Sequence, residues 1–102
     1  MYALILLLLY WSIYMKDSER PINKPYPSTA KGKKYSVIVM YQGKRKKLNF
    51  GAKGMDDWRS GSATKEQRKS YRARASGIKN KQGQRTYKLK HTANYWSYNY
   101  LW

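Results

Sequence analysis

The sequence predicts an α+β fold, in which an N-terminal hydrophobic helix and an extended linker precede a small basic domain. Three observations predict it: an uncharged apolar stretch over residues 1–15, a proline-containing stretch over 16–34, and a strongly basic remainder over 35–102 with hairpin and helix patterns. The whole chain has 102 residues and a formal net charge of +17. Its length allows one small domain with an appendage, and its charge predicts anionic partners.

Residues 1–15 have the sequence MYALILLLLYWSIYM, without a charged side chain. As a helix they would span about 22 Å, less than the ~30 Å of a hydrocarbon layer. Aromatic residues followed by Lys16 and Arg20 suit an uncleaved membrane anchor at the interface. Two alternatives remain. The helix could be buried against protein, or it could be a signal peptide, although the basic residues that normally begin a signal peptide are missing here. The predicted anchor residues are Leu4, Ile5, Leu6, Leu7, Leu8, Leu9, Tyr10, Trp11 and Tyr14.

Residues 16–34 have almost no apolar periodicity and contain Pro21, Pro25 and Pro27. Prolines close together favour extended backbone, so the stretch is predicted to be a semi-rigid spacer. A loop lying over a neighbouring subunit is the alternative.

A β-hairpin is predicted over about 35–50. Residues 35–41 (YSVIVMY) are rich in β-branched and aromatic side chains, Gln42 and Gly43 offer a two-residue turn, and apolar residues alternate again up to Phe50. The odd-numbered side chains of the first strand are expected to be buried.

A helix is predicted over about 64–76. Thr64 and Gln67 have the spacing of a capping box, Glu66 suits the helix dipole, and Gly77 supplies a stop. Lysine and arginine side chains cover most of its surface. We predict that basic residues of this helix and of the hairpin bind an anionic partner. These residues are Lys44, Arg45, Lys46, Lys47, Lys65, Arg68, Lys69, Arg72 and Arg74.

The stretch 92–102 (TANYWSYNYLW) has five aromatic residues among its final eight and is predicted to form a helix or turn after a cap at Thr92. Two interpretations remain open: the rings complete a small core, or they form a platform for bases or for a protein groove. The residues predicted for aromatic packing or an interface are Trp58, Tyr71, Tyr95, Trp96, Tyr98, Tyr100 and Trp102.

The composition argues against an enzyme. The chain has no cysteine, one histidine (His91) and five carboxylates, which are too few for most metal sites and catalytic groups. We therefore predict no catalytic residue, no metal and no cofactor. Asp56 and Asp57 are expected to pair with lysine or arginine, or to begin a turn.

Three ordered motifs in the basic domain resemble a small uncharacterised domain of large nucleocytoplasmic DNA viruses, the phycodnavirus and mimivirus-like group. The motifs are NFGAKG at 49–54, RKSYRAR at 68–74 and TANYWSYNYLW at 92–102. This chain has Asn49 where the family has histidine, and Met55 where it has tyrosine. The resemblance implies a virion part without enzymatic activity.

The resemblance implies a capsid, and the hydrophobic stretch 1–15 implies a membrane. With the spacer 16–34 and the basic domain 35–102, they give the layout expected of a minor capsid or cement protein that would bind the inner side of the capsomer lattice and tether it to an internal membrane. Its partners would be major and other minor capsid proteins in a hetero-oligomeric assembly. It would lie at the inner capsid surface and internal membrane of the virion, and in the host cytoplasm during assembly. A nucleic-acid-binding protein of the viral genome is the alternative, since net charge alone permits phosphate binding. A membrane-active basic protein is a third possibility.

Overall fold

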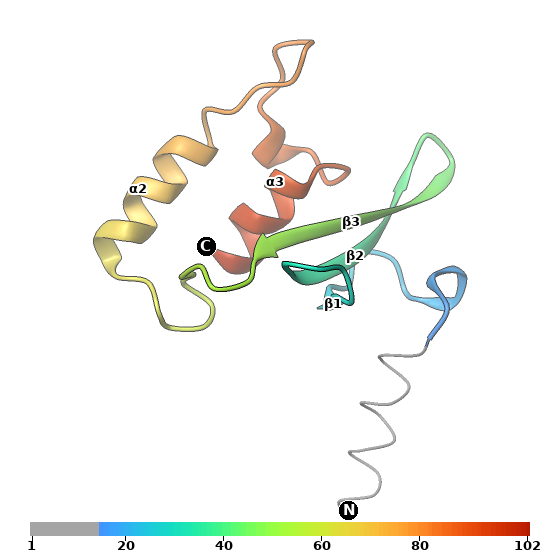
Figure 1. Ribbon diagram of the computed structural model, residues 1–102. Helices are drawn as coiled ribbons and strands as arrows, with labels where there is room; N and C mark the ends of the chain where they lie inside the picture. Colours follow the sequence, from blue (N-terminus) through green and yellow to red (C-terminus); the bar gives the residue numbers. More distant parts are fainter. Residues whose placement is uncertain (1–14) are drawn as a thin grey trace, which may run out of the picture.

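The centre of the molecule is a three-stranded antiparallel sheet of order β1-β2-β3, with helices beside it (Figure 1). The computed structural model describes residues 15–102 and confirms a small α+β domain. In chain order, the elements are η1 (Asp17–Glu19), β1 (Tyr26–Pro27), β2 (Lys33–Tyr41), β3 (Lys44–Ala52), α2 (Lys65–Ala75), η2 (Thr86–Lys88), α3 (Ala93–Trp96) and η3 (Ser97–Leu101).

The predicted hairpin is confirmed as β2 and β3, paired from Tyr41 opposite Lys44 to Lys33 opposite Ala52. Gln42 and Gly43 form its turn with φ angles of 52° and 75°. Two successive left-handed residues match the right-handed twist of the flanking strands, and this is why the Gln-Gly pair fixes the register.

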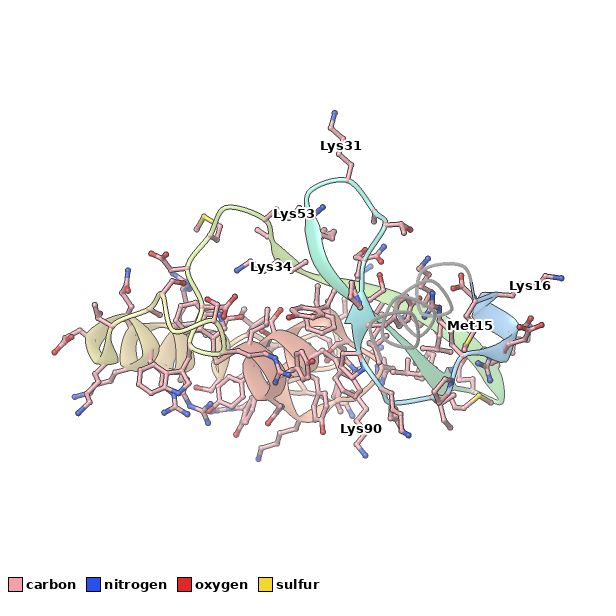
Figure 2. The ribbon with its side chains drawn as sticks, turned by 90° about the horizontal axis from the view of Figure 1, so that it is seen from below. Met15, Lys16, Lys31, Lys34, Lys53 and Lys90 are labelled. Carbon is pink, nitrogen blue, oxygen red and sulfur yellow. The ribbon has the colours of Figure 1, made fainter. Side chains whose placement is uncertain are left out.

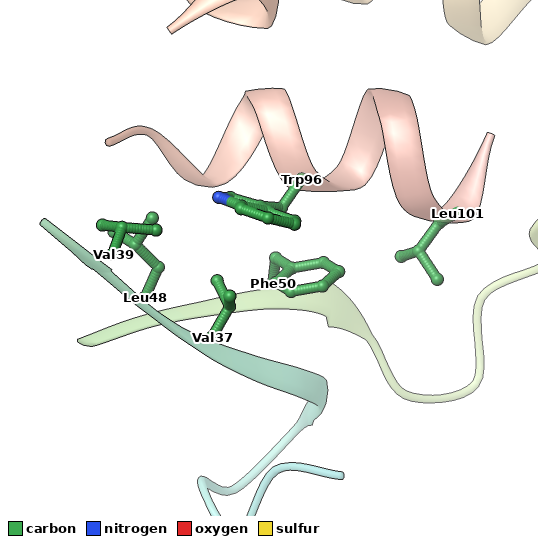
Figure 3. Close-up of a cluster of buried hydrophobic side chains, with 6 residues drawn as sticks. All are labelled: Val37, Val39, Leu48, Phe50, Trp96 and Leu101. Atoms are coloured by element: carbon green, nitrogen blue, oxygen red, sulfur yellow. The ribbon is translucent and has the colours of Figure 1, made fainter. Parts of the chain in front are cut away.

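The core lies between the hairpin and the C-terminal helical segment (Figure 3). Burial of the odd-numbered side chains of β2 is confirmed at Val37 and Val39, whereas Tyr41, near the turn, is 39% exposed. The indole Nε1 of Trp96 donates a hydrogen bond to the Lys90 carbonyl at 2.8 Å, so burial of this ring leaves its polar atom satisfied. The cluster contains Val37, Val39, Leu48, Phe50, Trp96 and Leu101.

The segment predicted as a spacer, residues 16–34, packs on the sheet. β1 pairs with β2, Ile22 forms a bridge with Ile38, and Arg20 is only 7% exposed. Pro27 is tolerated because β1 is an edge strand, so the backbone N–H that proline lacks is not needed for a hydrogen bond to another strand. The prediction of a free spacer therefore differs from the structure, in which this segment belongs to the domain.

The predicted membrane anchor falls in residues 1–14, outside the described residues. Over residues 15–102, no helix has both the length and the apolar character needed to cross a membrane.

Both predicted helix starts are confirmed. The Thr64 side chain accepts from the Gln67 amide at 3.1 Å, and the Gln67 side chain accepts from the Thr64 amide at 2.7 Å. Thr92 caps α3 through a 3.3 Å bond from the Tyr95 amide. α2 lies alongside α3 (Figure 1), and the Asn94 side chain connects the two by donating to the Ala75 carbonyl at 3.0 Å.

Candidate anion-binding surfaces

Four of the predicted cationic side chains lie together on one face of α2, around an exposed tryptophan. They follow the i, i+3, i+4, i+7 spacing that places residues on one helix face, and with Trp58 they line a depression of about 450 Å³. Over residues 15–102, none of the four forms an ion pair with an aspartate or glutamate side chain. We call this set the helix surface: Trp58, Lys65, Arg68, Lys69 and Arg72.

The two arginines of the helix surface also attach α2 to the C-terminal segment. The Arg68 Nε donates to the backbone oxygen of Trp102 at 2.9 Å, and its Cζ lies 4.5 Å from the centre of the Trp58 ring. Arg72 lies 4.1 Å over the ring of Tyr98 and donates to the Tyr98 carbonyl at 3.5 Å. These contacts hold both guanidinium groups in place, so the helix surface presents pre-oriented cations.

A second group, the hairpin surface, consists of Lys44, Arg45, Lys46 and Lys47, all exposed. Alternation along β3 sends these side chains to both faces of the sheet. On one face, Lys46 donates to the His91 carbonyl at 3.2 Å. On the other, Arg45 donates to the Asp17 carbonyl at 3.0 Å, and Lys47 pairs with the Asp17 carboxylate at 3.5 Å.

The structure therefore divides the predicted anion-binding residues. The helix surface and the hairpin turn lie at opposite ends of the domain (Figure 1). Arg74 belongs to neither, because it lies over the ring of Tyr71 and lines a larger cavity on another side of α2. Cations also project elsewhere: Figure 2 shows Lys31 and Lys90 on opposite sides of the molecule.

The larger cavity, of about 570 Å³, is electrically balanced. The stacked rings of Tyr71 and Trp102, 4.3 Å apart, form part of its wall, and burial raises the pKa of the Tyr71 hydroxyl. Three cations and three carboxylates line it, so it offers no net attraction to a polyanion. These charged residues are Lys33, Lys34, Arg74, Asp56, Asp57 and Glu66.

Asp57 confirms the prediction that one of the adjacent aspartates pairs with a cation and shapes a turn. It is 3% exposed, its Oδ2 lies 2.5 Å from Lys34 Nζ, and its Oδ1 accepts from the Ser60 amide at 2.7 Å. Burial alone would raise the pKa of this carboxyl, but the bonds from Lys34 and Ser60 outweigh burial and lower it. Residues 15–102 contain no group of three or more histidine and carboxylate side chains suited to a metal.

The predicted aromatic residues are mostly core or core-bordering. Trp96 is buried, and Tyr95, Tyr100 and Trp102 pack against the core cluster, which favours the core interpretation of the C-terminal rings. The guanidinium of Arg59 lies 3.9 Å over the ring of Tyr100, a pairing that the sequence analysis missed because the two residues are far apart in the chain.

The comparisons identify a family but no individual relative. Neither a curated protein nor a solved structure matches the chain. Residues 24–75 match a family model; they are 52 of the 102 residues, just over half, and include β1, β2, β3 and α2. The chain therefore belongs to DUF5754, a family of unknown function.

Proposed function

We propose that the chain is a minor capsid protein, a cement protein of a large icosahedral DNA virus, which binds the inner side of the capsomer lattice and tethers it to an internal membrane. The cationic surfaces bind acidic regions of major and other minor capsid proteins. The apolar stretch of residues 1–15 contacts the membrane. The sequence resemblance described above supports the viral part of this proposal, and the placement of the charges supports the cement part.

The observation that carries the cement function is the separation of the two cationic surfaces. From the hairpin turn, β3 runs from Lys44 to Ala52 toward the side of the domain on which α2 lies, and at about 3.3 Å per residue it covers roughly 26 Å (Figure 1). This distance exceeds the screening length of ~8 Å at physiological salt, so the surfaces attract anions independently. One domain can then hold two acidic subunits together, as a cement protein does.

Bridging can be tested with carboxylate-coated beads. The unmodified chain should bind the beads and aggregate them, with bead size followed by dynamic light scattering. Reversing either surface, by Lys65→Glu with Lys69→Glu or by Lys44→Glu with Lys46→Glu, should leave binding but abolish aggregation. Aggregation by both variants at the unmodified level would contradict bridging.

The matched control reverses two exposed lysines outside both surfaces, Lys79→Glu with Lys81→Glu. It changes the net charge equally and should preserve aggregation.

In a virus that encodes the protein, purified particles should contain it in fixed stoichiometry and release it at high salt or in detergent. Its absence from particles would exclude the capsid function.

One observation favours nucleic-acid binding as a second candidate. Trp58 is 37% exposed and stands among the four cations of the helix surface, an arrangement that suits a stacked base with flanking phosphates. If this function holds, Trp58→Leu should weaken oligonucleotide binding by about 5- to 100-fold, while Trp58→Phe retains most of it. An affinity that does not fall steeply with salt would exclude this candidate.

A further inference from the structure

We infer that the outer edge of β3 is a docking site for an acidic, extended segment of a partner protein, which adds a fourth strand to the sheet. The inference rests on the proposed function and names the kind of partner that the hairpin surface takes. It starts from the strand order: among the described residues 15–102, β3 is an edge strand that pairs with β2 on one side only.

Hydrogen bonds from the N-terminal segment establish which backbone groups of β3 face outward. The carbonyls of Ile38 and Lys34 accept from the Asn23 and Ser28 amides at 2.7 and 3.1 Å. Even-numbered residues of β2 therefore direct their backbone groups away from β3, and odd-numbered residues direct theirs toward it.

The register carries this alternation across to β3. Val37 and Val39 lie opposite Leu48 and Lys46, so these two β3 residues bond to β2. The amides and carbonyls of Arg45, Lys47 and Asn49 must then point to the free edge. Over residues 15–102, none of these outward groups has a backbone or side-chain hydrogen bond.

Charge complementarity determines the occupant. The edge carries four consecutive cations, and side-chain alternation places Lys44 and Lys46 on the core face and Arg45 and Lys47 on the other. A partner strand with carboxylates opposite them on both faces would gain cross-strand attraction as well as main-chain hydrogen bonds. A second copy of this edge would instead place like charges opposite each other, which disfavours self-pairing.

Amide hydrogen exchange tests the site directly. The probe is a capped nine-residue peptide with the sequence Glu-Glu-Thr repeated three times, which places carboxylates on both faces of an extended strand, added to the full chain in mild non-ionic detergent. We expect slower exchange at the amides of Lys47 and Asn49, since they become bonded, and little change at Lys46 and Leu48, which already bond to β2. Peptide binding without protection at Lys47 and Asn49 would overturn the inference.

A pair of variants separates the backbone from the charge. Lys47→Ala removes the side-chain charge, whereas Lys47→Pro also removes the outward N–H without breaking a bond to β2. If the strand adds, Lys47→Pro should bind the peptide about 3- to 10-fold more weakly than Lys47→Ala. Equal affinities would overturn the inference. Circular dichroism checks that both variants fold. If the proline variant does not fold, the exchange measurement on the unmodified chain tests strand addition instead.

The outcomes separate this inference from the proposed function. Salt-sensitive peptide binding with no amide protection overturns strand addition and leaves acidic-partner binding intact. No binding of the peptide or of carboxylate beads by the unmodified chain overturns both. Tight binding of an oligonucleotide in preference to the peptide, again without protection at the edge amides, overturns the inference in favour of nucleic acid.

Discussion

The two faces of the sheet are held by different kinds of interaction. On the face toward α3, fully buried apolar side chains such as Val37 and Phe50 pack against Trp96. On the opposite face, Ser36 is 0% exposed and donates to Asn49 Oδ1 at 2.6 Å and is 2.8 Å from Ser28 Oγ. The first face is stabilised by removing apolar area from water, and the second by satisfying buried polar atoms.

This difference explains how a chain with net charge +17 folds with so few apolar residues. The core cluster lies on one face; residues 16–28 cover the other, where they bury Ile38 and are held by backbone hydrogen bonds to β2 and by a cation–π contact within the segment. Substitutions on the two faces should therefore be costly for different reasons: lost volume on the core face, and orphaned polar groups on the other.

The largest effect is expected from truncation in the core face. Phe50→Ala should reduce the free energy of unfolding by about 3–5 kcal/mol, because Phe50 is 1% exposed and contacts the rings of Tyr35, Trp96 and Tyr100. A loss of this size approaches the whole stability of many small domains. Urea denaturation followed by circular dichroism measures it.

Met40→Ala is the control for this prediction. Met40 also lies in β2 but is 48% exposed, so its truncation should change stability by less than about 0.5 kcal/mol. Similar losses in the two variants would mean that the core cluster does not dominate the stability of the domain.

The next largest effect is expected at the end of β3. Gly51 has φ of +77°, and a Cβ there would lie 2.8 Å from Leu101 Cδ1. Gly51→Ala should cost about 1–2 kcal/mol for the left-handed backbone and a further 1–3 kcal/mol, roughly, for overpacking against the C-terminal segment.

Gly43→Ala separates these two contributions. Gly43 has φ of +75°, and within residues 15–102 no atom other than those of its chain neighbours lies within 4 Å of an added Cβ, so only the backbone contribution remains. Equal unfolding midpoints for the two alanine variants would show that the C-terminal segment moves away from the added Cβ at position 51 without a loss of stability.

The elements that the sequence predicted well are those with local signals. The hairpin follows from alternation and a Gln-Gly turn, and α2 follows from the Thr64–Gln67 capping box. Residues 16–34 carried no such signal, since proline is common both in linkers and in edge strands. Packing of this segment depends on Arg20, and a buried arginine has no local sequence signature.

The candidate site was predictable as a list of residues but not as an arrangement. The cations of the helix surface are recognisable from their helical spacing, whereas their separation from the hairpin surface depends on how α2 docks. Arg68 and Arg72 make that docking through bonds to Trp102 and Tyr98, which lie about thirty residues along the chain. The free edge of β3 likewise depends on strand order, which local patterns do not specify.

A smaller effect is expected on the polar face of the sheet. Ser36→Ala should cost about 1–3 kcal/mol, because the half-buried Asn49 Oδ1 loses the 2.6 Å bond from the fully buried Ser36 hydroxyl. Thermal unfolding of Ser36→Ala, Asn49→Ala and the double variant tests this in a mutant cycle. Additive losses would contradict the hydrogen bond as the source of stability.

The smallest effect is expected at the outer rim of the polar face. The Arg20 guanidinium lies 3.6 Å over the Tyr26 ring, while the Tyr26 hydroxyl makes an exposed 3.3 Å bond to Asp17. Tyr26→Leu removes the π-face beneath a buried cation and should cost about 0.5–2 kcal/mol. Tyr26→Phe keeps that face and loses the exposed bond to Asp17, so it should remain within about 0.5 kcal/mol of the unmodified chain. Equal destabilisation of the two variants, measured by urea denaturation, would assign the contribution of Tyr26 to its hydroxyl and remove cation–π packing from the forces that hold residues 16–28 on the sheet.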